Sequence, residues 1–93
     1  MGALPVVFLD HPGDGEVRQI SAGPFPFIAR ATDAEDGDLA ASIQWTSDVE
    51  GLLGVGARID HVPEPVGFHV ITASVTDSDG GVGSASVTLE MVP

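Results

Sequence analysis

The strict alternation of apolar and polar residues in two long segments constrains this fold most. Residues 68–76 and 82–92 each place apolar side chains, and one histidine, at every second position. A period of two sends successive side chains to opposite faces of a β-strand, so each segment predicts a long strand with one face against a core. The inward residues are His69, Ile71, Ala73 and Val75 in the first segment and Ala85, Val87, Leu89 and Met91 in the second; Ser84, Ser86, Thr88 and Glu90 are expected to face outward.

Four shorter segments, 6–9, 25–32, 43–47 and 57–62, predict further strands. The 12 glycines and 7 prolines are scattered between apolar runs, which is typical of frequent turns, and residues 10–15, 48–56 and 77–81 are expected to be loops. Residues 34–42 lack a helical apolar stripe and predict one helical turn at most. About seven short antiparallel strands indicate one all-β domain over residues 1–93, an immunoglobulin-like Greek-key sandwich, with residues 1–4 as a linker or an added start.

Charge and composition exclude several classes of function. The formal net charge is −11, with three arginines and no lysine. Binding to nucleic acids and to anionic membranes depends on Lys and Arg, so neither is expected. No apolar run approaches the ~20 residues of a membrane-spanning helix, so no membrane insertion is expected. The chain has no cysteine, which excludes disulfides and thiolate metal sites.

An ordered set of short motifs resembles the PKD-like and cadherin-like immunoglobulin modules of bacterial exported proteins. The set is Pro5-x-Val7-x-Leu9, Phe27-x-Ala29-x-Ala31-x-Asp33-x-Glu35-Asp36-Gly37-Asp38-Leu39, Ile43-x-Trp45-x-Ser47, Gly51-x-Leu53-Gly54-x-Gly56 and Gly67-x-His69-x-Ile71-x-Ala73-x-Val75-x-Asp77-Ser78-Asp79-Gly80. Residues 44–47, Gln-Trp-Thr-Ser, stand where PKD domains carry Trp-Asp-Phe-Gly-Asp-Gly.

This resemblance implies an extracellular or cell-surface location within a larger secreted protein. Such modules serve as spacers, as adhesion units, or as accessories to polysaccharide-degrading enzymes. The expected partners are therefore neighbouring domains of the same chain, other surface proteins or polysaccharide. The isolated domain is expected to be a monomer, although exposed edge strands leave weak homophilic contact open.

Two acidic segments are the main candidate for a binding site. They contain Asp33, Glu35, Asp36 and Asp38, and Asp77 and Asp79. In a Greek-key sandwich the loop after the second strand and the loop before the last strand lie at the same end, so these six carboxylates are expected to face one another. A calcium ion takes six to eight oxygen ligands and would offset their repulsion. The segments therefore predict a Ca²⁺ site.

The same residues have a simpler interpretation as turns. Aspartate caps its own backbone, and glycine supplies positive φ angles. Residues 33–38 are not an EF-hand loop, because the glycine comes one place early and no helices flank it. Mg²⁺ requires stricter octahedral geometry, and Zn²⁺ would favour histidine ligands, which both segments lack.

The remaining candidates favour structural roles. Trp45 and His69 lie in the inward phase of their strands and are expected in the core, with His69 bonded to a loop, whereas His11 and His61 are expected to face solvent. No catalytic motif is present, so enzyme activity is not expected. The alternative function is a carbohydrate-binding accessory domain. Phe8 and Phe68 fall in the outward phase of their strands, and an aromatic patch for sugar binding would have to be formed by these two rings.

Overall fold

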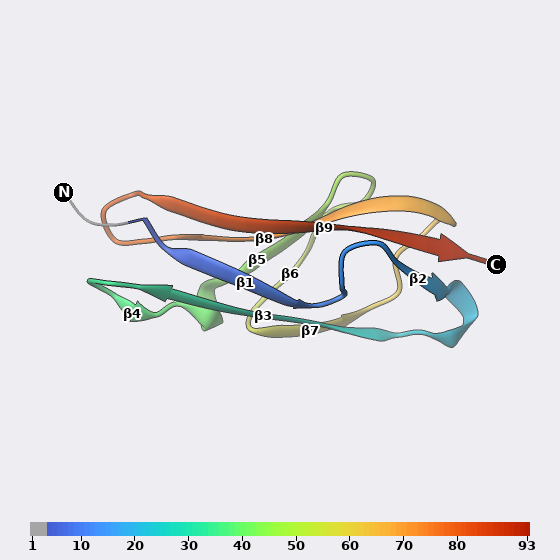
Figure 1. Cartoon of the computed structure of the whole chain (residues 1–93), viewed down its shortest axis with the longest axis horizontal. Helices are drawn as coiled ribbons and strands as arrows, with labels where there is room; N and C mark the ends of the chain where they lie inside the picture. Colours follow the sequence, from blue (N-terminus) through green and yellow to red (C-terminus); the bar gives the residue numbers. More distant parts are fainter. Residues whose placement is uncertain (1–3) are drawn as a thin grey trace.

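The computed structural model describes residues 4–93 as two β-sheets packed against each other (Figure 1). Strands account for most of these residues, and the helical content is limited to the 3-10 turns η1 (Ile20–Ala22) and η2 (Ala40–Ser42). Within this described part, no helix is long and apolar enough to span a membrane.

The first sheet is built around β3, and the second around β8 and β9. β3 (Phe25–Asp33) pairs antiparallel with β1 (Val6–His11), β4 (Gly37–Asp38) and β7 (Arg58–His61). The second sheet has the order β2-β9-β8-β5-β6, formed by β2 (Glu16–Gln19), β9 (Val82–Val92), β8 (Gly67–Thr76), β5 (Gln44–Ser47) and β6 (Gly51–Val55). The longest strand pairing in this second sheet joins β8 and β9 over ten residue pairs, from Gly67↔Met91 to Thr76↔Val82.

The core lies between the two sheets and follows from the alternation in the sequence. It consists of Phe27, Ala29, Ala31, Ile43, Trp45, Ile71, Ala73, Val75, Leu89 and Met91, each at most 2% exposed. The rings of Phe27 and Trp45, one from each sheet, lie 5.7 Å apart between centroids. Burial of the apolar face of each strand, rather than any cross-link, holds the sheets together.

The sequence-based expectation of an all-β, two-sheet domain is confirmed, as are the strands expected over 6–9, 25–32, 43–47, 57–62, 68–76 and 82–92. Three details were wrong. The expected loop over 48–56 contains the strand β6, and the strand β2 was not expected at all. The sandwich is also not wholly antiparallel, because β2 pairs parallel with β9 after the chain crosses from the first sheet to the second. Residues 1–3 of the expected linker lie outside the described residues.

The molecule is elongated, with extents of 47 × 19 × 18 Å. β1 begins at one end of the long axis, and β9 finishes at the other (Figure 1). The end where β1 begins also carries the β3–β4 turn and the β8–β9 loop (Figure 1). The two acidic segments therefore occupy the same end of the sandwich, as the sequence predicts.

Candidate functional site

The first acidic segment is a turn organised by the carboxylate of Asp33. Asp33 is the last residue of β3, and its Oδ1 accepts hydrogen bonds from the backbone N–H groups of Glu35 at 2.9 Å and Asp36 at 3.0 Å. Gly37 has a φ of 77°, a conformation that favours glycine, and it lets the chain reverse into β4. The turn is thus fixed by a side chain that caps its own backbone.

The second acidic segment is organised in the same way by Asp77, which follows β8. Its Oδ1 accepts hydrogen bonds from the backbone N–H groups of Asp79 at 2.9 Å and Gly81 at 2.8 Å. A β-carbon added at Gly81 would lie 2.9 Å from Oδ2 of Asp77, so a larger residue would displace this carboxylate. Both loops consequently present a carboxylate whose second oxygen, Oδ2, is not used by its own turn.

A pair of hydrogen bonds ties the two loops together. The carboxylate of Asp36 accepts one bond from the backbone N–H of Ser78 at 2.7 Å and another from the Ser78 hydroxyl at 2.8 Å. The two residues are 42 positions apart in the sequence. The loops are therefore joined directly to each other through these two residues.

Asp33 and Asp77 are the buried members of the site. Their exposed fractions are 7% and 8%, and their carboxyl groups lie close enough to interact. The hydrogen bond from the Asp36 amide, more than any other contact, holds the pKa of Asp33 below its usual range, although burial acts in the opposite direction. Asp33 is thus an ionised side chain at neutral pH, and its Oδ2 is buried with no hydrogen-bond partner in the described part of the chain.

The other four expected ligands are on the surface. Glu35, Asp36, Asp38 and Asp79 are exposed, and Oδ1 of Asp38 accepts a hydrogen bond from the backbone N–H of Ala40 at 2.9 Å. Across residues 4–93, no three acidic or histidine side chains are grouped so that they could hold a metal ion together. The structure thus brings the carboxyl groups of Asp33 and Asp77 together and joins their loops through Asp36 and Ser78, but it does not gather the six carboxylates at one point.

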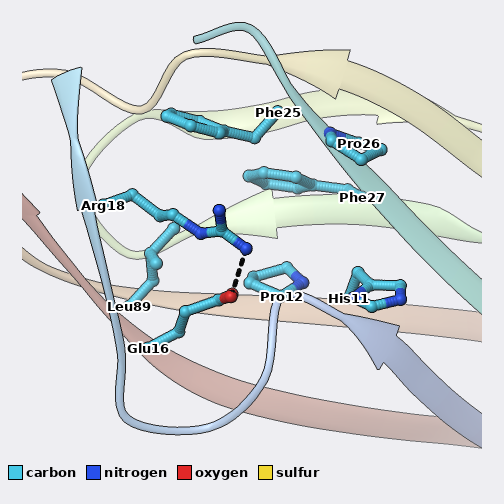
Figure 2. A pocket seen from close by; sticks show the side chains of 8 residues that line it. All are labelled: His11, Pro12, Glu16, Arg18, Phe25, Pro26, Phe27 and Leu89. Carbon is cyan, nitrogen blue, oxygen red and sulfur yellow. Dashed lines mark hydrogen bonds and ion pairs between the residues drawn. The ribbon is translucent and has the colours of Figure 1, made fainter. Parts of the chain in front are cut away.

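Two hollows of the molecule are lined by residues other than those of the acidic loops. A cavity of about 30 Å³ lies beside Phe25 and Phe27, where Arg18 forms an ion pair with Glu16 (Figure 2). This volume suits a water molecule rather than an organic ligand. A more open groove of about 200 Å³ between η2 and the end of β8 is lined mainly by uncharged polar side chains, namely Ser42, Gln44, Ser74 and Thr76 together with Val75.

Ser47 and His69 are residue types that serve as nucleophile and base in hydrolases, but here their contact is buried and has a structural role. Ser47 Oγ lies 3.4 Å from Nδ1 of His69, longer than a nucleophile–base hydrogen bond. The two residues are only 5% and 1% exposed, so a substrate has no access to them. Nε2 of His69 lies 2.7 Å from the carbonyl oxygen of Pro65, and this bond to a loop confirms the structural role expected of His69.

The exposed aromatic rings do not form a platform. Phe8 and Phe68 are 51% and 67% exposed, as their outward phase predicts. They belong to β1 and β8, which lie in different sheets, so the patch considered for carbohydrate binding is not formed. The guanidinium of Arg30 also covers the ring of Phe8, 5.1 Å from its centroid. The single tryptophan, Trp45, is fully buried as expected.

Sequence reasoning missed Ser78 as a member of the site. Its neighbours Asp77, Asp79 and Gly80 marked the segment as a turn, which gave no reason to single out the serine. Its role as a donor arises only because β3 and β8, in separate sheets, end at the same end of the molecule. Comparison with protein-family models and with curated proteins gives no match for this chain.

Proposed function

We propose that the chain is a non-catalytic immunoglobulin-like module of a larger extracellular or cell-surface protein, stabilised at one end by Ca²⁺ and acting as a spacer or adhesion unit. The observation that supports a bound cation is Oδ2 of Asp33, a buried carboxylate oxygen with no hydrogen-bond partner within residues 4–93, which lies beside a second buried carboxyl group, that of Asp77. A buried charged oxygen is costly unless a donor or a cation satisfies it.

Calcium is the cation that this donor set favours. The polar side chains that organise and join the two loops supply oxygen atoms that can bind a metal, namely the carboxylates of Asp33, Asp36 and Asp77 and the hydroxyl of Ser78. Ca²⁺ accepts carboxylates, backbone carbonyls and water in irregular shells, so two buried carboxylates can form its core, with backbone carbonyls and water supplying the other ligands. Mg²⁺ would demand a stricter octahedron.

The spacer role draws support from the shape of the domain. The chain enters at the acidic end and leaves at the opposite end of a body 47 Å long (Figure 1). Consecutive modules joined in this way would extend end to end rather than fold back. A cation that ties the β3–β4 turn to the β8–β9 loop would stiffen the end at which a preceding module would be attached.

The test is a titration of Ca²⁺ into chelator-treated protein, followed by amide NMR. Resonances of residues 33–38 and 77–81 are expected to shift together, with a dissociation constant of about 0.1–1 mM, as in extracellular calcium modules. At ten times that constant, binding would stabilise the fold by about 1.4 kcal/mol, which corresponds to a rise in Tm of roughly 5–10 °C for a domain of this size.

Two variants make this test specific. Asp33→Asn is expected to abolish the calcium-induced shifts and the rise in Tm. Glu64→Gln removes one negative charge between Pro63 and Pro65, outside both acidic loops, and is expected to leave both effects intact. If both loops stay unchanged at about 10 mM Ca²⁺, well above that range, the cation proposal fails. Equal loss in both variants would mean that only the general negative field attracts the ion.

The carbohydrate-binding alternative draws less support from this geometry. Sugar-binding sites rely on exposed aromatic faces, and Phe8 and Phe68 lie on different sheets. A pull-down with polysaccharide distinguishes the two proposals, because retention that does not respond to calcium would favour the accessory role.

A further inference from the structure

The edge strand β6 leaves one side of its backbone without a partner. β6 is the last strand of its sheet, and within residues 4–93 it pairs with β5 alone. An antiparallel neighbour bonds every second residue, so the remaining N–H and C=O groups of β6 point away from β5. Such a row of free donors and acceptors is a template for another extended strand.

The side chains of β6 leave this edge unprotected. An irregularity between Trp45 and Thr46 shifts the pairing, so that Leu52 and Val55 both lie opposite outward-facing residues of β5. Leu52 is 65% and Val55 is 56% exposed, whereas Leu53 packs against the core. The edge therefore offers two large apolar side chains next to unpaired backbone groups.

The charge pattern indicates which partner suits this edge. The chain carries a net charge of −11, so most of its surface repels a second copy. β6 has the sequence Gly-Leu-Leu-Gly-Val and carries no charge, whereas the edge strands β1, β2 and β7 contain Asp10, Glu16 and Arg18, and Arg58 and Asp60. Charged residues on edge strands hinder pairing, and like charges opposite each other are unfavourable.

We propose that β6 pairs antiparallel with β6 of a second copy of this chain, which joins the two five-stranded sheets into one continuous sheet. An antiparallel strand pair is self-complementary, so one uncharged strand supplies both halves of a two-fold symmetric contact. Leu52 and Val55 of each copy would then form apolar cross-strand pairs on the outer face. The contact is small and weak, and it is independent of the cation proposal because it lies outside both acidic loops.

The experiment is a dilution series of the wild-type chain in a chelator, which removes any bridging by cations. Sedimentation equilibrium over about 0.02–2 mM protein is expected to show a monomer–dimer equilibrium in the range of weak, transient interfaces. Amide resonances of residues 51–55 are expected to shift with concentration and to gain protection from hydrogen exchange, while those of residues 33–38 stay constant.

Leu52→Lys is expected to weaken dimerisation by about tenfold or more, since it places a charge on the pairing edge. Val6→Lys is the matched control, because Val6 is 50% exposed on β1 of the other sheet. Each substitution changes the net charge from −11 to −10, so neither increases repulsion between copies. Val55→Lys provides a second variant of the same edge if Leu52→Lys does not fold.

Three results would overturn the proposal. The first is a chain that stays monomeric over the whole concentration range. The second is concentration-dependent shifts that map outside residues 51–55. The third is an equal loss of dimer in Leu52→Lys and Val6→Lys, which would assign the association to a different surface.

Discussion

The indole nitrogen Nε1 of Trp45 donates a hydrogen bond to the carbonyl oxygen of Gly56 at 2.8 Å. Gly56 in turn donates its backbone N–H to the carbonyl oxygen of Ile43, also at 2.8 Å. The buried ring thereby fixes the point at which the chain leaves β6 for β7. Trp45→Phe is expected to destabilise the fold by about 2–4 kcal/mol, since it leaves a cavity and an unpaired carbonyl. Urea unfolding followed by circular dichroism measures this, and a loss below about 0.5 kcal/mol would contradict it.

Gly83 allows β9 to pass close to the start of the chain. A β-carbon at this position would lie 2.2 Å from the carbonyl oxygen of Pro5, a backbone atom that cannot move aside easily. Gly83→Ala is expected to destabilise the domain by about 1–3 kcal/mol through this overpacking. Gly13→Ala is the control, because nothing lies within 4 Å of its added β-carbon. Thermal unfolding of the two variants should differ clearly, and equal Tm values would show that β1 can shift without cost.

The contact between His69 and Pro65 defines the tautomer of the buried imidazole. Because Nε2 lies 2.7 Å from a carbonyl oxygen, which only accepts hydrogen bonds, the neutral ring must carry its proton on Nε2. Nδ1 is then free to accept a bond from the Ser47 hydroxyl. Long-range ¹⁵N–¹H correlation spectra of the histidine ring should show the Nε2–H form, and a dominant Nδ1–H form would contradict this assignment.

The ion pair of Asp10 and Arg30 makes a pH-dependent contribution to stability. Two hydrogen bonds from the guanidinium, at 2.9 and 3.0 Å, hold the pKa of Asp10 below its ordinary value of 3.8. A carboxyl group whose pKa is lower in the folded state stabilises the fold above its unfolded pKa, and this stabilisation is lost as the pH falls through the folded pKa. The contribution is therefore expected to be complete above about pH 5 and to disappear in strong acid.

A carboxyl NMR titration of Arg30→Gln tests this pair. The pKa of Asp10 is expected to rise toward 3.8 when the guanidinium is removed. Arg58→Gln is the control, since Arg58 pairs with Asp60 on β7, and it is expected to leave the titration of Asp10 unchanged. An unaltered Asp10 in Arg30→Gln would mean that the pair does not persist in solution.

Alternation in the sequence was sufficient to predict the strands that have one buried face. β8 and β9 bury every second residue over much of their length, so their period could be read directly. β2 was missed because its residues Glu-Val-Arg-Gln are exposed or half-buried, and its one apolar side chain, Val17, is 55% exposed. β6 was taken as a loop because two glycines and the irregular pairing with β5 break its period.

The candidate site was predictable in its position and not in its detail. The order of the strands sufficed to bring residues 33–38 and 77–79 to one end, because that depends on topology alone. Two features depend on the torsion angles of single side chains. They are the bridge between Asp36 and Ser78, and the Asp33 oxygen that has no hydrogen-bond partner among residues 4–93. The burial of Asp33 does follow from the sequence, because it continues the inward phase of Phe27, Ala29 and Ala31, whereas Asp38 lies beyond that strand and is exposed.

The parallel pairing of β2 with β9 has a mechanical consequence. Hydrogen bonds between strands lie across the strand direction, and the chain enters and leaves at opposite ends of the long axis (Figure 1). Tension applied through flanking segments would therefore load the β2–β9 bonds in shear, so that they share the force instead of opening one at a time. A domain connected in this way is expected to yield abruptly at high force and to transmit smaller loads without stretching.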